Sequence, residues 1–431
     1  MFEKIKEKIT SKNLLPLILF LVVLINFIPL IKVNILTKKS FSVELIPMIV
    51  AMGIECVILI LYYLKKIKFT KEVIINFGVL LIVTIASFVI QAIAYKNNNY
   101  EVLDFANIAC KFVNVILLFV LVLNTKVEEK YINTFMKGIL YMGLIACLQN
   151  MILYFQDILG HFNLVKTTEK IYLCKSFFAH KNQFALFLFT SIIATIFLFQ
   201  KENKTAYKVF LGIALVIFGL NLIVTFSRTG TAMSILFLVL WFLFTNKIKI
   251  KTKIILGIIA AVCGIACIAI LNEVNPVLLK KLLRLESVKT FTGRTVFWDL
   301  AEKELMLSPA NTIFGIGRFK AEELIAKYNV TQFHNTYVEF LVSGGIVELL
   351  YFIALYLIVI IKMIKSKMDR KYKSIYIAMF ISYAIYMCFE SLGRFSIGCS
   401  DTLCLIFFLT IPLLHANSCK KEEGVEESKW L

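Results

Sequence analysis

Long apolar runs, separated by short polar segments, follow one another along almost the whole chain. Each run has about the 20 residues that an α-helix needs to cross a bilayer. Backbone groups inside lipid must be hydrogen-bonded within their own segment, so runs of this length are predicted to be helices rather than strands. The pattern predicts about twelve spans, at 14–31, 43–64, 73–94, 107–123, 135–155, 182–199, 207–225, 229–244, 253–271, 338–362, 373–393 and 401–415.

One sizeable polar segment, residues 272–336, interrupts this pattern between spans 9 and 10. Apolar spacing of helical type occurs at 276–285 and again at 293–307, where Ser308 and Pro309 follow. A glycine-rich turn is predicted at 314–319 and a further helical piece at 320–328. The expected architecture is therefore all-α: a polytopic membrane domain over 1–417 with a helical external loop at 272–336, then a tail at 418–431.

The composition agrees with a membrane domain, since 59% of the residues are hydrophobic, 17% are charged, and the mean hydropathy is +0.82. The net charge of +19 does not indicate nucleic-acid binding, because the Lys residues lie in short clusters between apolar runs rather than along one face. If successive connections alternate between the two sides of the membrane, these clusters all fall on the same side. The positive-inside rule makes that side cytoplasmic, together with both termini, and places 156–181 and 272–336 outside the cytoplasmic (inner) membrane.

Cysteine and carboxylate patterns give no indication of a metal or cofactor site. Seven of the ten Cys fall inside predicted spans, where a thiol behaves as a small apolar group. The spacing shows neither a zinc motif nor a disulfide framework, and 272–336 has no clear carboxylate cluster for a divalent ion. We therefore expect no metal and no cofactor.

Arginine is rare, with only six among 47 basic residues, so each one merits attention. Arg228 lies in Ser227-Arg228-Thr229-Gly230, between spans 7 and 8, and Arg294 lies four residues before Trp298. The first could snorkel to headgroups, and the second could belong to an interfacial helix anchored by its aromatic residue. The functional interpretation is that two guanidinium groups near one membrane face bind a lipid-linked diphosphate.

Two histidine motifs stand at the outer ends of predicted spans. His334 precedes span 10 in His334-Asn335-Thr336-Tyr337, where an imidazole could take a proton from a sugar hydroxyl; a lone His is more often structural. His180-Lys181-Asn182 precedes span 6, either as an interfacial cap or as a supporting polar site that contacts phosphate or sugar.

Three glutamates are predicted inside spans: Glu55 in span 2, Glu348 in span 10 and Glu390 in span 11. A charge at membrane depth is costly unless it is paired or hydrated. A proton or ion pathway and an internal pairing, for instance with Lys111, both remain open.

Four motifs in this order resemble the O-antigen ligase and O-antigen polymerase superfamily of bacterial membrane glycosyltransferases. They are the 180–182 turn, the 227–230 motif, the stretch from Gly293-Arg294 through Trp298 to Gly317, and the 334–337 motif running on to Gly344-Gly345. The resemblance implies a GT-C-like helical enzyme, metal-independent and inverting. It would take glycan from an undecaprenyl-diphosphate-linked donor on the outer face of the membrane.

By motif, the resemblance assigns Arg228 and Arg294 to the donor diphosphate and His334 to the general base. Supporting contacts are expected from Lys181, Asn182, Arg318 and Asn335. It leaves the acceptor open, because ligases use lipid A core, polymerases extend another lipid-linked repeat, and some relatives modify proteins. A polysaccharide or lipid-linked oligosaccharide transporter or flippase is the main alternative, and a sensor or scaffold that uses the charged tail is a further one.

Overall fold

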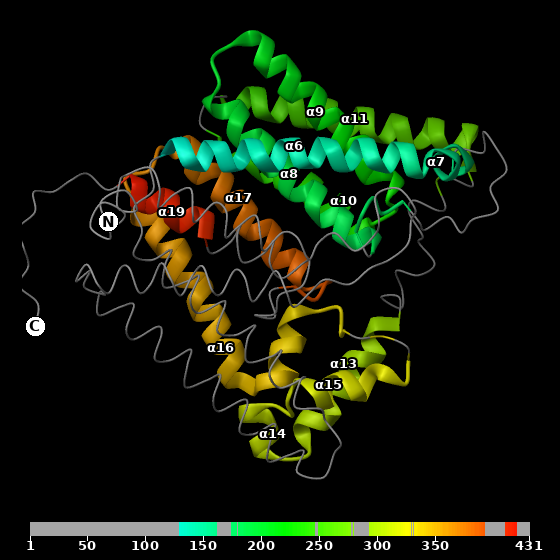
Figure 1. Ribbon diagram of the computed structural model, residues 1–431, viewed down its shortest axis with the longest axis vertical. Helices are drawn as coiled ribbons and strands as arrows, with labels where there is room; N and C mark the ends of the chain where they lie inside the picture. Colours follow the sequence, from blue (N-terminus) through cyan, green and yellow to red (C-terminus); the bar gives the residue numbers. More distant parts are fainter. Residues whose placement is uncertain are drawn as a thin grey trace, which may run out of the picture.

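The computed structural model describes residues 129–161, 174–178, 180–245, 249–276, 279, 293–328, 330, 332–392 and 410–419 (Figure 1). Every regular element in these ranges is helical, which confirms the all-α prediction. The predicted spans between 14 and 123 lie outside the described residues, as do most of the run at 401–415 and nearly all of the tail. The total of about twelve spans and the domain division at 417 remain predictions.

The first half of the described chain follows the predicted spans closely. The helices are α6 (Glu129–Leu153), α7 (Phe155–His161), α8 (Lys181–Lys201), α9 (Thr205–Val224), α10 (Arg228–Phe244) and α11 (Ile250–Val274). Among the described helices, α6, α8, α9, α11 and the later α16 are long and apolar enough to cross a membrane, and α10 is shorter. The chain is therefore a multi-pass membrane protein.

The second half contains a helical cap and two long helices. The cap consists of α13 (Arg294–Met306), α14 (Pro309–Phe314) and α15 (Arg318–Ala326), and it is followed by α16 (Thr336–Lys365), α17 (Arg370–Met387) and α19 (Ile411–Ser418). The predicted helix at 293–307 is confirmed, whereas the short helix α14 was not expected. The run predicted at 373–393 is wrong at its end: α17 stops at Met387, so Glu390 lies beyond the helix rather than within it.

Helix α8 forms the centre of the bundle and packs against α6, α9, α10 and α17 (Figure 1). Its side chains from Phe184 to Leu198 are buried, and rings pack across helices, with Phe189 against Tyr383 and Phe197 stacked on Tyr372. Because apolar residues cover all sides of α8, it suits a position surrounded by other helices.

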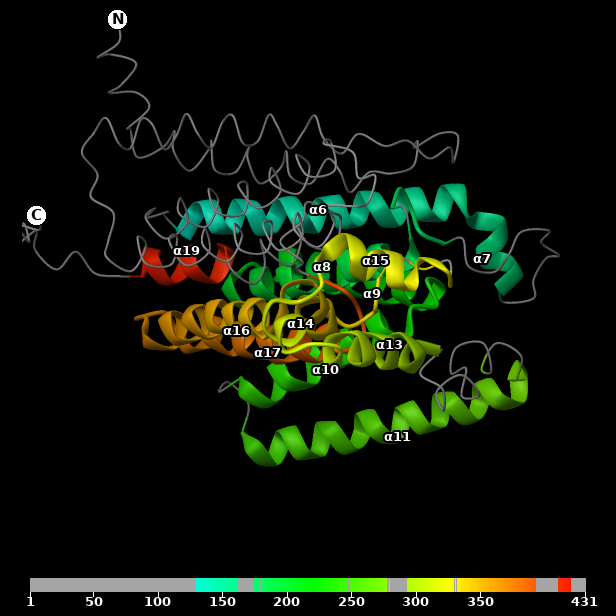
Figure 2. The ribbon, with the colours of Figure 1, turned by 90° about the horizontal axis from the view of Figure 1, so that it is seen from below.

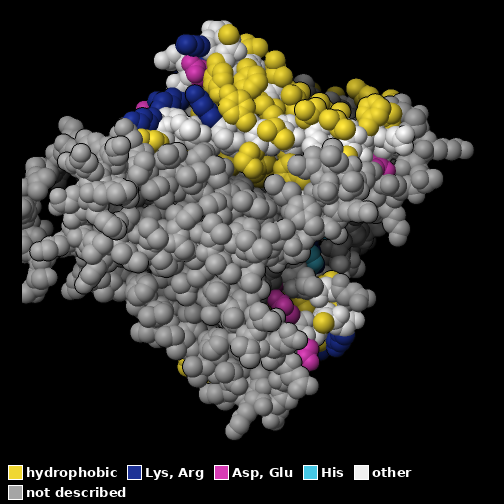
Figure 3. Space-filling model, viewed as in Figure 1, with side chains coloured by type: hydrophobic (Ala, Val, Ile, Leu, Met, Phe, Trp, Pro, Cys, Tyr) yellow, Lys and Arg dark blue, Asp and Glu magenta, His cyan; other side chains and the backbone are white. Residues whose placement is uncertain are grey.

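Helices α9 and α11 instead present apolar side chains outward. On α9, four large aliphatic residues at spacings of three and four are more than half exposed: Val209, Ile213, Val216 and Leu220. Helix α11 runs along one edge of the molecule, with nearly all its described side chains exposed (Figure 2). On the face shown in Figure 3, apolar side chains gather over α6 and α9, with Lys and Arg at one end of this area. Such a surface is suited to lipid rather than to water.

The cap is joined to α16 by backbone contacts that only glycine permits. Helix α16 breaks at Gly345, where φ is 69° and ψ is −167°. A Cβ atom on Gly345 would lie 2.1 Å from the carbonyl oxygen of Ile313, and one on Gly315 would lie 2.5 Å from the carbonyl carbon of Ser343. The Ile316 amide donates to the Val342 carbonyl at 2.8 Å, so the segment after α14 lies directly against the first part of α16.

We expect Gly345→Ala to lower the free energy of unfolding by about 2 kcal/mol or more, because a left-handed backbone alone costs a non-glycine residue about 1–2 kcal/mol. The clash with Ile313 adds to this cost. The matched control is Gly212→Ala on α9, where a Cβ meets nothing within 4 Å. Thermal unfolding in detergent should show a lower midpoint for the first variant alone, and equal midpoints would contradict the role of the break.

Candidate active site

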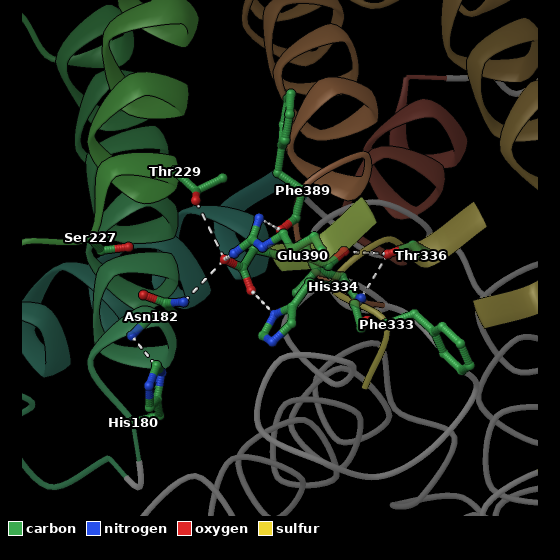
Figure 4. A network of polar contacts seen from close by, with 12 residues as sticks. His180, Asn182, Ser227, Thr229, Phe333, His334, Thr336, Phe389 and Glu390 are labelled. Carbon is green, nitrogen blue, oxygen red and sulfur yellow. Dashed lines mark hydrogen bonds and ion pairs between the residues drawn. The ribbon is translucent and has the colours of Figure 1, made fainter. Parts of the chain in front are cut away.

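Glu390 occupies the centre of a buried polar network just beyond the end of α17 (Figure 4). Its side chain is only 6% exposed. One carboxylate oxygen, Oε1, accepts from Asn182 Nδ2 at 3.0 Å and from Arg294 Nη2 at 3.1 Å, and it lies 3.4 Å from the hydroxyl of Thr229. Arg294 also donates through Nη1 to the carbonyl of Phe389. The network therefore joins segments that are far apart in the sequence.

Four of the partners of Glu390 come from the first residues of helices. Asn182 lies in the first turn of α8, Thr229 in that of α10 and Arg294 in that of α13, while Thr336 begins α16 and donates to the Glu390 carbonyl at 2.8 Å. A helix N-terminus carries a partial positive charge and free N–H groups. Three of these termini place side chains on the carboxylate and the fourth binds the Glu390 carbonyl, so four helix starts stabilise this buried residue. The same arrangement can bind an added anion.

The motifs noted in the sequence are the caps of these helices. The His180 ring accepts from the Asn182 amide at 3.2 Å at the start of α8, and Ser227 Oγ accepts from the Gly230 amide at 3.4 Å at the start of α10. Asn335 Oδ1 accepts from the amides of Tyr337 and Val338. Short polar side chains at these positions satisfy N–H groups that have no partner within the helix. Asn335 thus has a capping role, beside its predicted contact with substrate.

His334 lies at the partly exposed edge of the network, one residue before Asn335, which caps α16. Its backbone has φ 55°, and its ring nitrogen Nδ1 is 3.4 Å from Glu390 Oε2. The side chain is 22% exposed, so it contacts both the buried carboxylate and the surface of the site. A neutral imidazole that donates from Nδ1 to a carboxylate keeps its lone pair on Nε2. The pairing with Glu390 therefore favours the tautomer that can act as a base.

A second glutamate holds the segments of His334 and Glu390 together. Glu339, in the first turn of α16, is 4% exposed, and its Oε1 accepts from the Phe333 amide and from Ser391 Oγ, both at 2.7 Å. Trp298 adds a bond from its indole N–H to the Phe333 carbonyl at 3.0 Å. Phe333, the residue before His334, and Ser391, the residue after Glu390, thus donate to the same oxygen of Glu339. This fixes the distance between the imidazole and the carboxylate.

The electrostatic surroundings keep Glu390 ionised. Burial raises the pKa of Glu390, but the hydrogen bond with His334 and the charge of Arg294 outweigh it, so the pKa lies below its usual value. Partial burial and the charge of Lys181 lower the pKa of His180, although Glu390 acts in the opposite direction. The site thus contains a carboxylate, and His180 favours its neutral form.

The remaining predicted residues lie around this network. Lys181 Nζ donates at 3.4 Å to the carbonyl of Phe226, a residue with φ 50° in the turn before Arg228. Arg228 is the first residue of α10, next to Thr229, and is half-buried. Arg318 begins α15, but its side chain lies outside the described residues. The structure therefore brings Asn182, Arg294 and His334 onto one carboxylate and places Lys181 and Arg228 at the same helix starts.

Comparison with known families identifies the part of the chain that contains most of these residues. Residues 213–353 match the family model described as O-antigen ligase. The chain carries an O-antigen ligase domain. The match confirms the resemblance predicted from the ordered motifs, and it runs from α9 to α16, so it includes Arg228, Arg294 and His334. A search of curated proteins finds no match.

The O-antigen ligase domain places the chain among membrane proteins that transfer or polymerise glycan in surface polysaccharide biosynthesis. Two parts of the network, the 180–182 turn and Glu390, lie outside the matched residues. Within the described ranges, no group of three or more His, Cys, Asp or Glu is placed to hold a metal ion. Metal-independent transfer remains a prediction.

The sequence pattern did not indicate the contacts that Glu390, Glu339 and Thr336 make in this network. The sequence indicates Glu390 only as a charge within a predicted span that could be paired. The available signal is the free-energy cost of an unpaired charge at membrane depth. Glu339 carries a weaker signal, as an acidic residue in the first turn of a helix. The sequence position of Glu390 or Glu339 does not by itself indicate which distant residues its carboxylate contacts.

Proposed function

We propose that this chain transfers or polymerises glycan from an undecaprenyl-diphosphate-linked donor on the outer face of the cytoplasmic membrane, without a metal and with inversion at the sugar. The observation that carries the proposal is the pair of His334 Nδ1 and Glu390 Oε2, placed where four helix N-termini meet beside Arg294. A base and an anion site in one place are what this reaction needs. The acceptor is another glycan or lipid-linked glycan.

His334 is the proposed general base. Its Nε2 accepts the proton of the acceptor hydroxyl as the acceptor oxygen forms a bond to the anomeric carbon. The bond between that carbon and the diphosphate oxygen breaks on the opposite face, which inverts the configuration. The imidazolium that forms is stabilised by the carboxylate of Glu390, 3.4 Å from Nδ1. Glu390 thus sets the tautomer before the step and compensates the charge after it.

The leaving diphosphate is assigned to Arg228, with Lys181 beside it. Both residues stand at the first position of their helices, where the N-terminal partial charge adds to that of the side chain. Arg294 already donates to Glu390 and to the Phe389 carbonyl, so we assign it first to holding the carboxylate. These cationic groups supply the charge stabilisation that a divalent ion supplies in other enzymes.

The proposal is tested with the purified full-length chain in proteoliposomes that contain lipid-linked repeat units. Longer or transferred glycan should appear together with released undecaprenyl diphosphate. A transporter or flippase would instead move the intact lipid-linked molecule across the bilayer without forming a new glycosidic bond. That result would exclude the proposed transfer.

Arg228→Lys should raise the KM for the lipid-linked donor about tenfold, because an ammonium cannot bind a diphosphate through two parallel hydrogen bonds. The matched control is Arg370→Lys, which changes the first residue of α17 at the opposite end of that helix from Glu390. Initial rates measured against donor concentration separate KM from kcat. An unchanged KM in Arg228→Lys would remove this residue from the diphosphate site.

A further inference from the structure

The tip of the cap, residues 305–317 from the end of α13 to the turn after α14, is an uncharged piece of an otherwise charged segment, and part of it is exposed. Glu302, Lys303 and Glu304 precede it, and Arg318 and Lys320 follow it. Between them, four large apolar side chains are exposed: Met306 at 73%, Leu307 at 70%, Ile313 at 44% and Phe314 at 41%. An exposed cluster of this kind indicates contact with a partner rather than with water.

The tip has a defined shape. Ser308 caps α14, with its hydroxyl accepting from the Asn311 amide at 3.1 Å, and Asn311 and Thr312 bond back to carbonyls of α13. The polar groups of the turn are thus used inside it, while Met306, Leu307, Ile313 and Phe314 are exposed. The exposure of those side chains belongs to a folded element.

The depth of the tip follows from the break in α16. From Gly345 to Lys362, in the last turn of α16, the helix rises about 26 Å at 1.5 Å per residue, close to the roughly 30 Å of a bilayer hydrocarbon core. The positive-inside rule predicts that the basic cluster beginning at Lys362 lies at one membrane boundary, which puts Gly345 near the other. Ile313 packs directly on Gly345, which places the tip at that second boundary.

The tip also continues a surface that faces lipid. Beyond Gly345, α16 exposes an apolar stripe at spacings of three and four: Ile346, Leu350, Ile353, Leu357, Ile361 and Ile364. The stripe begins at Ile346, directly after the glycine against which Ile313 packs. The exposed apolar surface therefore extends from the span onto the cap.

We propose that residues 305–317 insert Met306, Leu307, Ile313 and Phe314 into the acyl-chain boundary of the bilayer leaflet at this end of the spans. The cap is then held at its two sides, by Arg294 and Trp298 at the active site and by lipid at the tip. This contact does not depend on the proposed reaction. Under that proposal, it keeps the cap at the bilayer boundary, from which a lipid-linked donor reaches the site.

The test is photolabelling of the full-length chain in vesicles of phosphatidylethanolamine and phosphatidylglycerol. One sample contains a phospholipid with a diazirine on its acyl chain, and a second receives a water-soluble diazirine. Peptides are then compared by mass spectrometry. We expect the lipid probe to label 305–317 with a yield comparable to that of the exposed apolar residues of α9, from Val209 to Leu220. The yield should be many times that of α15.

Two outcomes would overturn the proposal. Labelling of 305–317 by the aqueous probe alone would place the tip in water. Labelling by neither probe, while α9 is labelled by lipid, would show that protein covers it, either another part of this chain or a second copy. As a variant, Leu307→Glu should lower lipid labelling of the tip severalfold, whereas Tyr328→Glu, an equally drastic change at an exposed ring after α15, should leave it unchanged.

Discussion

Glu390→Gln should lower the rate of glycan transfer by about 10²–10⁴-fold, the range expected when a base is held in the wrong tautomer. Glutamine has the same shape, and its amide oxygen can still accept from Asn182 and Arg294. Its NH₂ group then points to His334, which must accept at Nδ1 and carry its proton on Nε2. The lone pair needed for catalysis is lost, although the packing is kept.

The control for this variant is Glu348→Gln, the same substitution at another buried glutamate, located in α16 beyond its break. Transfer from a lipid-linked donor is measured for both proteins at equal amounts of folded protein, checked by thermal unfolding. Full activity in Glu390→Gln would exclude the proposed role of the carboxylate. A loss in Glu348→Gln alone would instead favour a buried proton pathway and thus transport.

His334→Asn should also lower transfer by about 10²–10⁴-fold, because the residue that takes the acceptor proton is removed. Asparagine is the suitable replacement, since His334 has φ 55° and Asn tolerates this left-handed backbone better than Ala does. The KM for the donor should change little, because the diphosphate contacts are assigned elsewhere. Initial rates against donor concentration give both values.

The two substitutions should not be additive. Since Glu390 is proposed to act through His334, the double variant His334→Asn with Glu390→Gln should be little slower than His334→Asn alone. In the wild type, the lowered pKa of Glu390 means that this carboxylate stays ionised to a lower pH than an ordinary glutamate does. Rate losses that multiply in the double variant would contradict the pairing.

The sequence by itself determined most of the helices and where several of them begin. Apolar runs of span length form helices because a backbone in lipid must bond within itself, and α8 and α10 begin within a residue or two of the predicted spans. Polar residues at helix starts are equally local signals, since Ser227 and Asn335 cap the helices that follow them. These features depend on neighbours a few residues away.

Only the tertiary structure decided which helix starts meet. Glu390 contacts Asn182, Thr229, Arg294 and His334, which lie between 56 and 208 positions away along the chain. The contacts depend on the packing of α17 against α8, α10 and α16, and of α13 against α16, and no local pattern specifies that packing. The sequence therefore predicted the arginines and the histidine as separate candidates. The buried carboxylate that joins them became visible only when four positively polarised helix ends were brought to one point, where an anion is stabilised.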